Sequence, residues 1–347
     1  MVVIVEQNRT GHRSYYVRLL AEAAIARGEQ VVVVTSADES MGIRADDLPE
    51  QVRIEHAEFF DPAHIARMSR RAAAQHVVVP DGDRFAIALA RAGKWQSTAS
   101  ITVLVMRETA QPAPLPFVQL LKTALRRRFF RRAARISGVR IGVLKSAGWA
   151  GRSDFVPVVD PVTLIASRED AQHLRDQLEL SSDRYWFAVL GAVSARKNIG
   201  LIGEALERGL GTPVGLLIAG RLDEDVRSHV EELERRSRGW TDPVIVVDRL
   251  LSDRDLDAAV LAVDALILAH SNEGPSGLLG KAAAAGTRVI AAGAQSLRVD
   301  LAALGDLGEW VPLSPDHLEA AMRRAIDLPA PMPALAPTVA GFAEALL

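Results

Sequence analysis

Residues 268–293, LAHSNEGPSGLLGKAAAAGTRVIAAG, place a carboxylate, a glycine-rich turn, an alanine-rich helix and an apolar strand next to one another. Glu273 follows the apolar run 265–269, and the turn 274–277 precedes residues with the composition of a helix. The first turn of a helix exposes backbone N–H groups that attract anions, and glycines let a phosphate approach the backbone closely. The segment therefore predicts a phosphate-binding loop, with an ordinary strand-to-helix turn as the alternative.

Arg196 and Lys197 form a second candidate for anion binding. They lie in residues 191–198, GAVSARKN, between an expected strand and an expected helix. Cationic side chains at such a loop can neutralise phosphates, although basic residues before a helix also commonly form a solvated edge. If both loops follow strands of one parallel sheet, they lie at the same edge, where a diphosphate could bridge them.

Alternating short strands and helices are expected to position these loops. In the first half, residues 2–5 read as a buried strand, 14–27 as an amphipathic helix and 30–35 as the next strand. Further apolar runs typical of strands, with helical patterns between them, lie at 77–79, 101–105 and 141–144. This alternation is typical of a parallel sheet that helices cover on both faces.

Residues 156–161, VPVVDP, interrupt the pattern with two prolines, and we place the boundary between two domains there. The alternation then resumes. Expected strands lie at 185–190, 214–219, 244–247, 265–269, 288–291 and 310–311. Expected helices lie at 199–207, 223–236, 256–263 and 315–328, before the proline-rich residues 329–337 and a short helix near 338–347.

The interpretation is an α/β protein of two tandem Rossmann-like, doubly wound domains, residues 1–159 and 160–328, followed by a segment 329–347. Open parallel sheets bind ligands at the carboxyl ends of their strands, so the expected active site is a central cleft that the two domains face. The length agrees, because 347 residues suffice for two domains of about 150 residues each.

The composition is that of a soluble globular protein, with 49% hydrophobic and 24% charged residues. Residues 1–11 lack the basic leader and long apolar core of a signal peptide, and no apolar run is long enough to span a membrane. We therefore expect a cytoplasmic protein. The absence of cysteine excludes disulfides and thiolate sites, and the scattered histidines offer no metal-ligand spacing, so no metal or other cofactor is expected.

The two halves of the chain carry opposite net charge. Residues 1–159 contain 23 Lys and Arg against 15 Asp and Glu, whereas residues 160–347 contain 18 against 28. Two domains with different partners explain this difference better than one uniform surface.

The stretch from Lys122 to Arg135, KTALRRRFFRRAAR, concentrates seven basic residues, with Leu125, Phe129 and Phe130 between them. Such a stretch can lie on an anionic membrane surface, as a peripheral contact at the inner membrane face, or attract an acidic acceptor. The alternative is a solvated helix whose aromatic residues face the core. No nucleic-acid recognition motif accompanies the basic residues, so a nucleic-acid partner is not expected.

Four segments of the second half follow one another in a familiar order and spacing. They are GAVSARKN at 191–198, LLIAGRLDED at 216–225, VIVVDRLLSDRDLDAAVLAVDALIL at 244–268, and the Glu273 loop running into AAAAGTRVIAAG. Together they resemble the second domain of retaining nucleotide-sugar glycosyltransferases of the GT-B fold, family 4. The resemblance implies an enzyme of carbohydrate biosynthesis that moves a hexose-like group, with anomeric retention and without a metal, from a nucleoside diphosphate sugar to a hydroxyl acceptor. The basic stretch from Lys122 to Arg135 favours an acceptor that is anionic or membrane-associated.

The resemblance also implies roles for residues of the second half. Arg196 and Lys197 would hold the donor diphosphate, and Glu273 would meet the sugar or its leaving oxygen. Arg249 and Leu250 would lie by the nucleobase. Backbone and hydroxyl hydrogen bonds to phosphate and sugar would come from Ser276, Gly277, Leu278 and Leu279.

The first half resembles the family more loosely, through Gly11-His12 after the first strand and the exit at 156–157. Gly11 would let its loop approach the donor diphosphate. His12 is a candidate catalytic residue that would donate a hydrogen bond to the acceptor or the diphosphate, and the alternative is that it caps or packs at the start of the helix.

Two positions depart from the family pattern. The family has a second glutamate eight residues after the first, and here Lys281 occupies that position. A lysine cannot accept hydrogen bonds from ribose hydroxyls, so either ribose recognition shifts or Lys281 binds phosphate. A histidine that many members present from the first domain is missing from residues 106–108, where Arg107 either contacts sugar or acceptor or takes part in a surface ion pair near Glu108.

These departures leave other functions open. A non-catalytic relative that binds a nucleotide sugar or sugar phosphate, and acts as a partner or regulatory protein, is the main alternative. A GT-B epimerase, which needs no acceptor, is a third.

Overall fold

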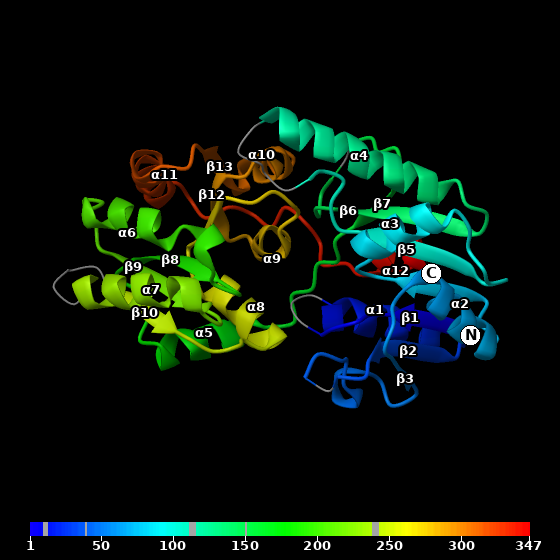
Figure 1. Ribbon diagram of the computed structural model, residues 1–347. Coiled ribbons are helices and arrows are strands. Elements are labelled where there is room, and N and C mark those ends of the chain that lie inside the picture. The colour runs from blue at the N-terminus through cyan, green and yellow to red at the C-terminus, as the bar shows by residue number, and fades with distance from the viewer. Residues whose placement is uncertain (10–12, 39, 111–115, 150, 238–242) are drawn as a thin grey trace. The chain divides into compact units, whose positions relative to one another are not determined.

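The computed structural model describes most of the chain, as Figure 1 shows. The described residues are 1–9, 13–38, 40–110, 116–149, 151–237 and 243–347. They form two compact units. The first comprises residues 1–145, 151–159 and 339–347, and the second comprises residues 146–150 and 160–338.

The first unit contains a parallel sheet of seven strands in the order β3-β2-β1-β4-β5-β6-β7. The strands are β1 (Val2–Val5), β2 (Val31–Ser36), β3 (Arg53–Ala57), β4 (His76–Val79), β5 (Ser100–Val105), β6 (Val139–Lys145) and β7 (Val156–Val159). The helices are α1 (Arg13–Ala26), α2 (Pro62–Arg71), α3 (Asp83–Ala92), α4 (Pro116–Ala134), α12 (Ala340–Leu346) and the short 3-10 helix η1 (Ala45–Asp47).

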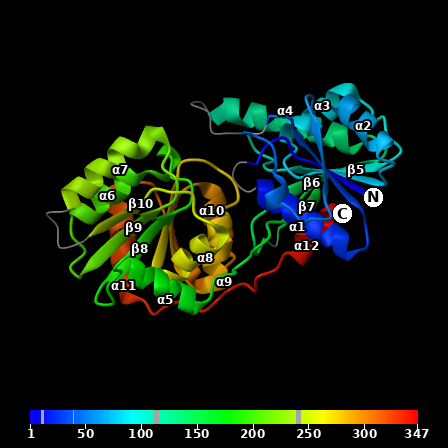
Figure 2. The same cartoon turned by 90° about the horizontal axis from the view of Figure 1, so that it is seen from below.

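Helices cover both faces of the first sheet (Figure 2). Val3 and Val5 of β1 pack into a core with residues of α2, α3 and α4. Val2 and Ile4 point the other way, into a core with residues of α1 and α12. Successive side chains of a strand point to opposite faces, so a strand buried on both faces is apolar throughout. This is why β1 could be predicted from its sequence.

Residues 156–159 form a strand that the sequence did not predict. They are β7, the edge strand of the first sheet, in which Pro157 lies opposite Val143, and the second unit resumes at residue 160. An edge strand has no neighbour on its outer side, so it tolerates a proline that has no N–H to donate. The opposite edge strand, β3, was not predicted because its sequence, RIEHA, is mostly polar.

The carboxyl-terminal helix α12 belongs to the first unit. Its Phe342 and Leu346 are buried, and the ring centroid of Phe342 lies 4.7 Å from that of Tyr16 in α1. The carbonyl oxygen of Leu346 accepts a hydrogen bond from His76 Nε2 at 2.9 Å. The segment 329–347, which the sequence set apart, is thus shared between the two units, with residues 329–338 in the second.

The second unit contains a parallel sheet of six strands in the order β10-β9-β8-β11-β12-β13. The strands are β8 (Tyr185–Leu190), β9 (Val214–Ala219), β10 (Val244–Val247), β11 (Ala265–His270), β12 (Arg288–Gly293) and β13 (Gly308–Val311). The helices are α5 (Arg168–Gln177), α6 (Ile199–Glu207), α7 (Glu224–Ser237), α8 (Asp253–Ala262), α9 (Gly277–Ala285), α10 (Gln295–Ala302) and α11 (Pro315–Asp327), with 3-10 helices η2 (Ala195–Lys197) and η3 (Gly305–Leu307).

This sheet is also covered on both faces. Residues of α6, α7 and α11 pack into one core, and residues of α5, α8, α9 and α10 pack into the other. The expectation of two doubly wound α/β domains with parallel sheets is confirmed. Helices α5 and α10 were not predicted. The sequence of α5, REDAQHLRDQ, carries few apolar residues, and that of α10, QSLRVDLA, is only about two turns long.

Candidate functional site

The strand order of each sheet reverses once, between β1 and β4 in the first unit and between β8 and β11 in the second. In open α/β sheets, ligands bind outside the carboxyl ends of the strands at such a reversal. In the second unit, Arg196 and Lys197 follow β8, and Glu273 follows β11. The two loops that the sequence singled out therefore flank the reversal point of one sheet.

Direct hydrogen bonds join these two loops. The carbonyl oxygen of Arg196 accepts from the backbone N–H of Ser271 at 3.0 Å. Asn198, which follows η2 with a left-handed φ of 51°, donates from Nδ2 to the carbonyl oxygen of Ala269 at 2.9 Å. The guanidinium of Arg196 reaches Asn272 Oδ1 at 3.5 Å. The loop after β8 is therefore held against the loop after β11.

Lys197 is the most unusual residue of the site. Its side chain is only 4% exposed, and its ammonium donates a hydrogen bond to the carbonyl oxygen of Leu190. Burial, together with the neighbouring charge of Arg196, lowers the pKa of Lys197 to about 7. Near neutral pH this amine is therefore poised to gain a proton when an anion arrives.

The Lys197 ammonium and the first turn of α9 meet at Gly191. A Cβ atom on Gly191 would lie 3.7 Å from Lys197 Nζ and 4.0 Å from Leu278 Cδ1. Gly191 has a φ of +80°, and its carbonyl oxygen would lie only 2.0 Å from a Cβ atom on Gly220. Glycine at these two positions thus allows the ends of β8 and β9 to approach each other. Because Gly191 has no side chain, its backbone also stays accessible beside the buried Lys197.

Glu273 binds the amino terminus of α10. Its Oε1 accepts from the N–H of Gln295 at 2.9 Å and its Oε2 accepts from the N–H of Ser296 at 2.8 Å. The hydroxyl of Ser296 in turn contacts the backbone N–H and carbonyl oxygen of Gly274, each at 3.0 Å. Each carboxylate oxygen keeps a second lone pair for a ligand hydroxyl, so Glu273 can both shape the loop and contact a sugar.

Replacing Glu273 by alanine should lower the free energy of unfolding by about 1 to 2 kcal/mol, because two N–H groups at a helix start would lose their acceptor. Glu273→Gln keeps one acceptor oxygen and should lose less. Urea unfolding measures both changes. Glu224→Ala, in the first turn of α7 with an almost fully exposed side chain, is the matched control. Equal stability of Glu273→Ala and the wild type would contradict this role.

The amino terminus of α9 begins at Ser276, whose side chain makes no capping hydrogen bond. The N–H of Leu279 donates to the carbonyl oxygen of Ser276 at 3.1 Å, and its side chain is buried, so Leu279 serves the helix rather than a ligand. Within the described residues, the N–H groups of Gly277 and Leu278 have no backbone acceptor. A carboxylate oxygen of Asp160 lies 3.8 Å from the Cβ position of Gly277, so an incoming phosphate would share this space with it.

Lys281 has partners inside the second unit. Its ammonium pairs with Asp257, whose side chain is fully buried, and donates to the carbonyl oxygen of Thr163 at 2.8 Å. Asp257 also accepts from the N–H of Ile165 at 2.7 Å. If Lys281 binds phosphate, which is one of its two expected alternatives, it would have to leave this ion pair.

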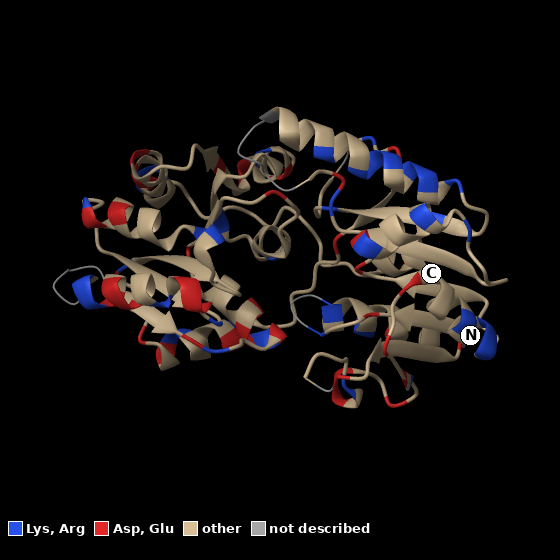
Figure 3. Ribbon diagram, viewed as in Figure 1, with Lys and Arg blue, Asp and Glu red and all other residues tan. Residues whose placement is uncertain are grey.

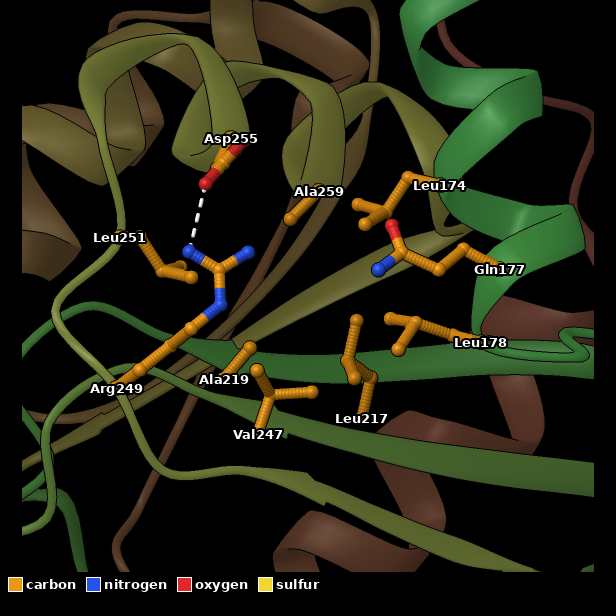
Figure 4. Close-up of a pocket in the computed structure, with 10 residues that line it drawn as sticks. All are labelled: Leu174, Gln177, Leu178, Leu217, Ala219, Val247, Arg249, Leu251, Asp255 and Ala259. Atoms are coloured by element: carbon orange, nitrogen blue, oxygen red, sulfur yellow. Dashed lines mark hydrogen bonds and ion pairs between the residues drawn. The ribbon is translucent and has the colours of Figure 1, made fainter.

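Arg249 lines a small hollow at the carboxyl ends of β9 and β10 (Figure 4). Its guanidinium donates to Asp255 Oδ2 at 2.7 Å, and this hydrogen bond holds the pKa of Asp255 below its usual range. Leu251 lines the hollow, whereas Leu250, the expected neighbour of a nucleobase, is 82% exposed. The cavity volume is about 50 Å³, well below that of a small-molecule site, so a base would need more room than this hollow gives.

A larger cavity, about 390 Å³, lies at the opposite edge of the second sheet. It is lined by residues at the amino ends of strands, among them Tyr185, Asp264 and Arg288. Their polar groups bond to the protein itself: Asp264 accepts from the N–H of Trp186 at 2.7 Å, and Arg288 donates to the carbonyl oxygen of Pro329. Asp264 and Arg288 at this edge therefore contribute hydrogen bonds to the fold of the second unit.

The sequence interpretation missed His270. It is the last residue of β11, 9% exposed, and its Nε2 has no hydrogen-bond partner within the described residues. Burial, with the charges of Lys197 and Arg196, lowers the pKa of His270 to about 3, so the imidazole stays neutral near pH 7. The expected strand stopped at Ala269, and a lone polar residue after an apolar run gives no sign of such burial.

The first unit has a buried acid at its own reversal point, which the sequence interpretation also missed. Glu6 directly follows β1 and is 4% exposed, and burial raises its pKa to about 8. Arg13 lies 3.7 Å from Glu6 and donates from Nε to Asp81, which follows β4, at 2.7 Å. A carboxyl that stays protonated can donate a hydrogen bond to a hydroxyl. Gly11 and His12, the expected ligand residues of this edge, lie outside the described residues.

The loop after β5 holds an ion-pair cluster centred on Glu108. Lys145 Nζ donates to Glu108 Oε1 at 2.5 Å, and Arg127 donates to Oε2 at 2.9 Å. We expected Arg107 either to contact sugar or acceptor or to take part in a surface ion pair near Glu108. The basic partners of Glu108 named above come from β6 and α4. The carbonyl oxygen of Arg107 accepts from Arg126 Nε at 2.9 Å.

Two searches of the described residues bear on other kinds of site. No group of three or more His, Cys, Asp or Glu side chains is arranged to hold a metal ion among them. The described helices include none with the length and apolar character that crossing a bilayer requires.

Comparison with known proteins gives matches in structure only. No protein-family model matches the sequence, and no curated protein matches it significantly. HepE from Anabaena, crystallised with UDP and glucose, superimposes with a TM-score of 0.65 and 16% identity over 94% of this chain and 89% of that chain. Sucrose-phosphate synthase from Thermosynechococcus elongatus gives 0.65 and 16% over 99% and 93%.

A third similar structure is WaaG, a glycosyltransferase involved in lipopolysaccharide biosynthesis, with a TM-score of 0.59 and 14% identity over 94% of this chain and 91% of that chain. The protein has the GT-B glycosyltransferase fold. At these identities the similarity establishes the fold alone.

Proposed function

We propose that this protein transfers a sugar from a nucleoside diphosphate donor to a hydroxyl acceptor. The observation that carries the proposal is the meeting of the buried Lys197 ammonium and the first turn of α9 at Gly191. A cation and unpaired helix amides at the reversal point of a parallel sheet form a site for a diphosphate. The similar structures support this reading, because HepE has been crystallised with UDP-glucose.

The main catalytic task of the site is to stabilise the leaving group. Negative charge grows on the diphosphate as the bond to the anomeric carbon of the sugar lengthens. The Lys197 ammonium lies close to Gly191, as does the side chain of Leu278 in the first turn of α9. Together with the N–H groups of Gly277 and Leu278, which have no backbone acceptor within the described residues, this cation would stabilise the growing charge. Arg196, which is exposed on the same loop, adds a second cation at the rim.

The proposal includes retention of the anomeric configuration, which rests on the resemblance to family 4. In this mechanism the acceptor hydroxyl attacks from the face that the diphosphate leaves, and its proton passes to the departing diphosphate oxygen. The residues of the second unit thus act on the leaving group rather than as a nucleophile. The acceptor, anionic or membrane-associated, would be met by the first unit, whose protonated Glu6 can bind a hydroxyl. No metal is required in this scheme.

One observation favours a second candidate, a non-catalytic protein that binds a nucleotide sugar or sugar phosphate. The position of the family's second glutamate holds Lys281, and that lysine is committed to Asp257. Ribose recognition therefore lacks its usual carboxylate. Loss of that contact would weaken donor binding without necessarily removing the diphosphate site.

Incubation with a panel of UDP-, ADP- and GDP-sugars should release the nucleoside diphosphate slowly from one donor, and faster when a hydroxyl acceptor is added. NMR of the product should show the donor's anomeric configuration. The same donor, at 100 times its dissociation constant, should raise the free energy of unfolding by about 2.7 kcal/mol.

Three other results would separate the candidates. Stabilisation by a donor with no turnover across acceptors would favour the binding protein. A product of opposite configuration would reject retention and keep transfer. No stabilisation by any nucleoside diphosphate, its sugar conjugates or a sugar phosphate would reject both candidates.

A further inference from the structure

Helix α4 carries a continuous exposed stripe along its whole length. The exposed side chains recur every three or four residues and therefore share one face of the helix. They are Phe117, Leu120, Leu121, Ala124, Leu125, Arg128, Arg131, Arg132 and, just after the helix, Arg135. The first half of this stripe is apolar and the second half is cationic. We refer to these residues as the α4 stripe.

The opposite face of α4 packs on the first unit. Phe130 is fully buried, and Phe129 packs against the same core. Arg126 lies over the Phe130 ring at 4.9 Å and pairs with Asp83 at 2.6 Å. The aromatic residues of the basic segment thus face the core, as the alternative interpretation expected. They are not the residues that make the α4 stripe apolar.

The apolar half of the α4 stripe is unusual for a surface in water. Phe117 is 64%, Leu120 70%, Leu121 67% and Leu125 52% exposed. Of the eleven large hydrophobic side chains exposed in the described residues, these four fall within nine positions. Such a concentration marks an interaction surface, because isolated exposed apolar residues are common but clustered ones are not.

The cationic half of the α4 stripe contains arginines without an ion-pair partner among the described residues. In the part of the chain that the structure describes, Arg128, Arg132 and Arg135 have no such partner, whereas Arg131 pairs with Asp154 at 2.5 Å. Residues 116–135 contain no Asp or Glu. Figure 3 shows the Lys and Arg gathered on the carboxyl-terminal part of α4, with the amino-terminal part free of charge. The partner must therefore offer negative charge beside apolar groups.

We propose that the α4 stripe binds the surface of an anionic lipid bilayer, with its apolar half inserted among the lipids and its arginines against the headgroups. A bilayer presents both chemistries within a few ångströms, and one helix lying flat would meet both. A second copy of this chain fits less well, because pairing two stripes would set arginine against arginine or arginine against leucine. Nucleic acid would leave the apolar half without a role.

The test is binding of the full chain to vesicles. Vesicles of phosphatidylcholine with 30% phosphatidylglycerol should sediment with the protein, and pure phosphatidylcholine vesicles should bind it at least tenfold more weakly. Each basic residue near an anionic surface strengthens binding about fivefold. Arg128→Glu combined with Arg132→Glu should therefore weaken binding by more than about 25-fold. Leu120→Ser combined with Leu121→Ser should weaken it by about tenfold or more.

Matched variants keep the test specific. Arg27→Glu with Arg71→Glu changes the same charge on exposed residues at the carboxyl ends of α1 and α2, and Phe59→Ser with Met332→Ser removes exposed apolar side chains elsewhere. These variants should bind as the wild type does, and all variants should melt like it. Wild-type protein that ignores anionic vesicles, or α4 variants that bind them normally, would overturn the proposal.

Two further results would assign the α4 stripe to another partner. Conversion of a dimer to a monomer by Leu120→Ser with Leu121→Ser, without vesicle binding by the wild type, would assign it to self-association. Binding of DNA or RNA that only the arginine variant loses, without vesicle binding, would assign it to nucleic acid. None of these readouts involves glycosyl transfer, so this proposal and the proposed function can fail separately.

Discussion

Replacing Lys197 by methionine should lower donor turnover by about 100- to 1,000-fold, the usual loss when one group that stabilises a developing anion is removed. The physical reason is that Lys197 is the buried cation beside Gly191, where the diphosphate is proposed to leave. Methionine matches the length of the lysine stem and suits a side chain that is 4% exposed, so the fold should persist. Steady-state kinetics with the active donor measure the change.

Lys94→Met is the control for this experiment, because Lys94 is exposed in the first unit and has no proposed role. It should leave turnover unchanged. A Lys197→Met protein that melts normally and turns over donor at the wild-type rate would remove the central residue of the proposed function.

Lys197→Met should also change how the affinity for UDP depends on pH. Burial lowers the pKa of Lys197 to about 7, and a bound diphosphate would raise it again because the anion favours the ammonium. Above pH 7 the free protein must therefore take up a proton on binding. The affinity for UDP should fall by up to about tenfold per pH unit between pH 7.5 and 9. Lys197→Met should bind UDP more weakly and lose this slope, which calorimetry in buffers of different ionisation enthalpy would reveal.

Replacing Lys281 by alanine should lower the free energy of unfolding by about 3 to 5 kcal/mol, since it leaves the fully buried Asp257 without its counter-charge. Urea unfolding of the wild type and the variant gives the difference. The double variant Lys281→Met with Asp257→Asn should recover most of the loss, because it removes both charges while the Asn oxygen can still accept from Ile165 N–H.

This prediction also decides between the two expected roles of Lys281. If Lys281→Ala unfolds like the wild type but loses affinity for UDP, the lysine serves a ligand and the ion pair contributes little. If stability falls and the double variant binds UDP normally, the lysine serves the fold. Ribose recognition must then come from other residues.

Much of the fold could be predicted from the sequence. Strands β1, β2, β8, β9 and β11 are buried on both faces, so each is a continuous apolar run that needs no other context. The edge strands were harder to read. In β3 the exposed positions are polar, and in β7 a proline suggested a break.

The site was predicted in part. Arg196, Lys197 and Glu273 follow strands of one parallel sheet, and parallel strands bring their carboxyl ends to one edge, so their meeting could be inferred before any coordinates. The burial of His270 and Glu6 could not be inferred. Both stand at the ends of apolar runs, where a polar residue usually marks the return to solvent, and only the packing of neighbouring strands decides otherwise.

Sequence patterns alone were enough to predict the central strands, the two doubly wound units, and the loops that carry charge for an anion. These properties follow from local composition and from the chirality and connectivity of parallel sheets. Tertiary structure alone decided which groups those charges meet. Glu273 binds the start of α10, Lys281 pairs with Asp257, and the aromatic residues of α4 turn inward while its leucines turn outward. Each of these outcomes depends on which groups are buried and on partners distant in the chain. The spacing of residues in the sequence indicates neither the burial nor the partners.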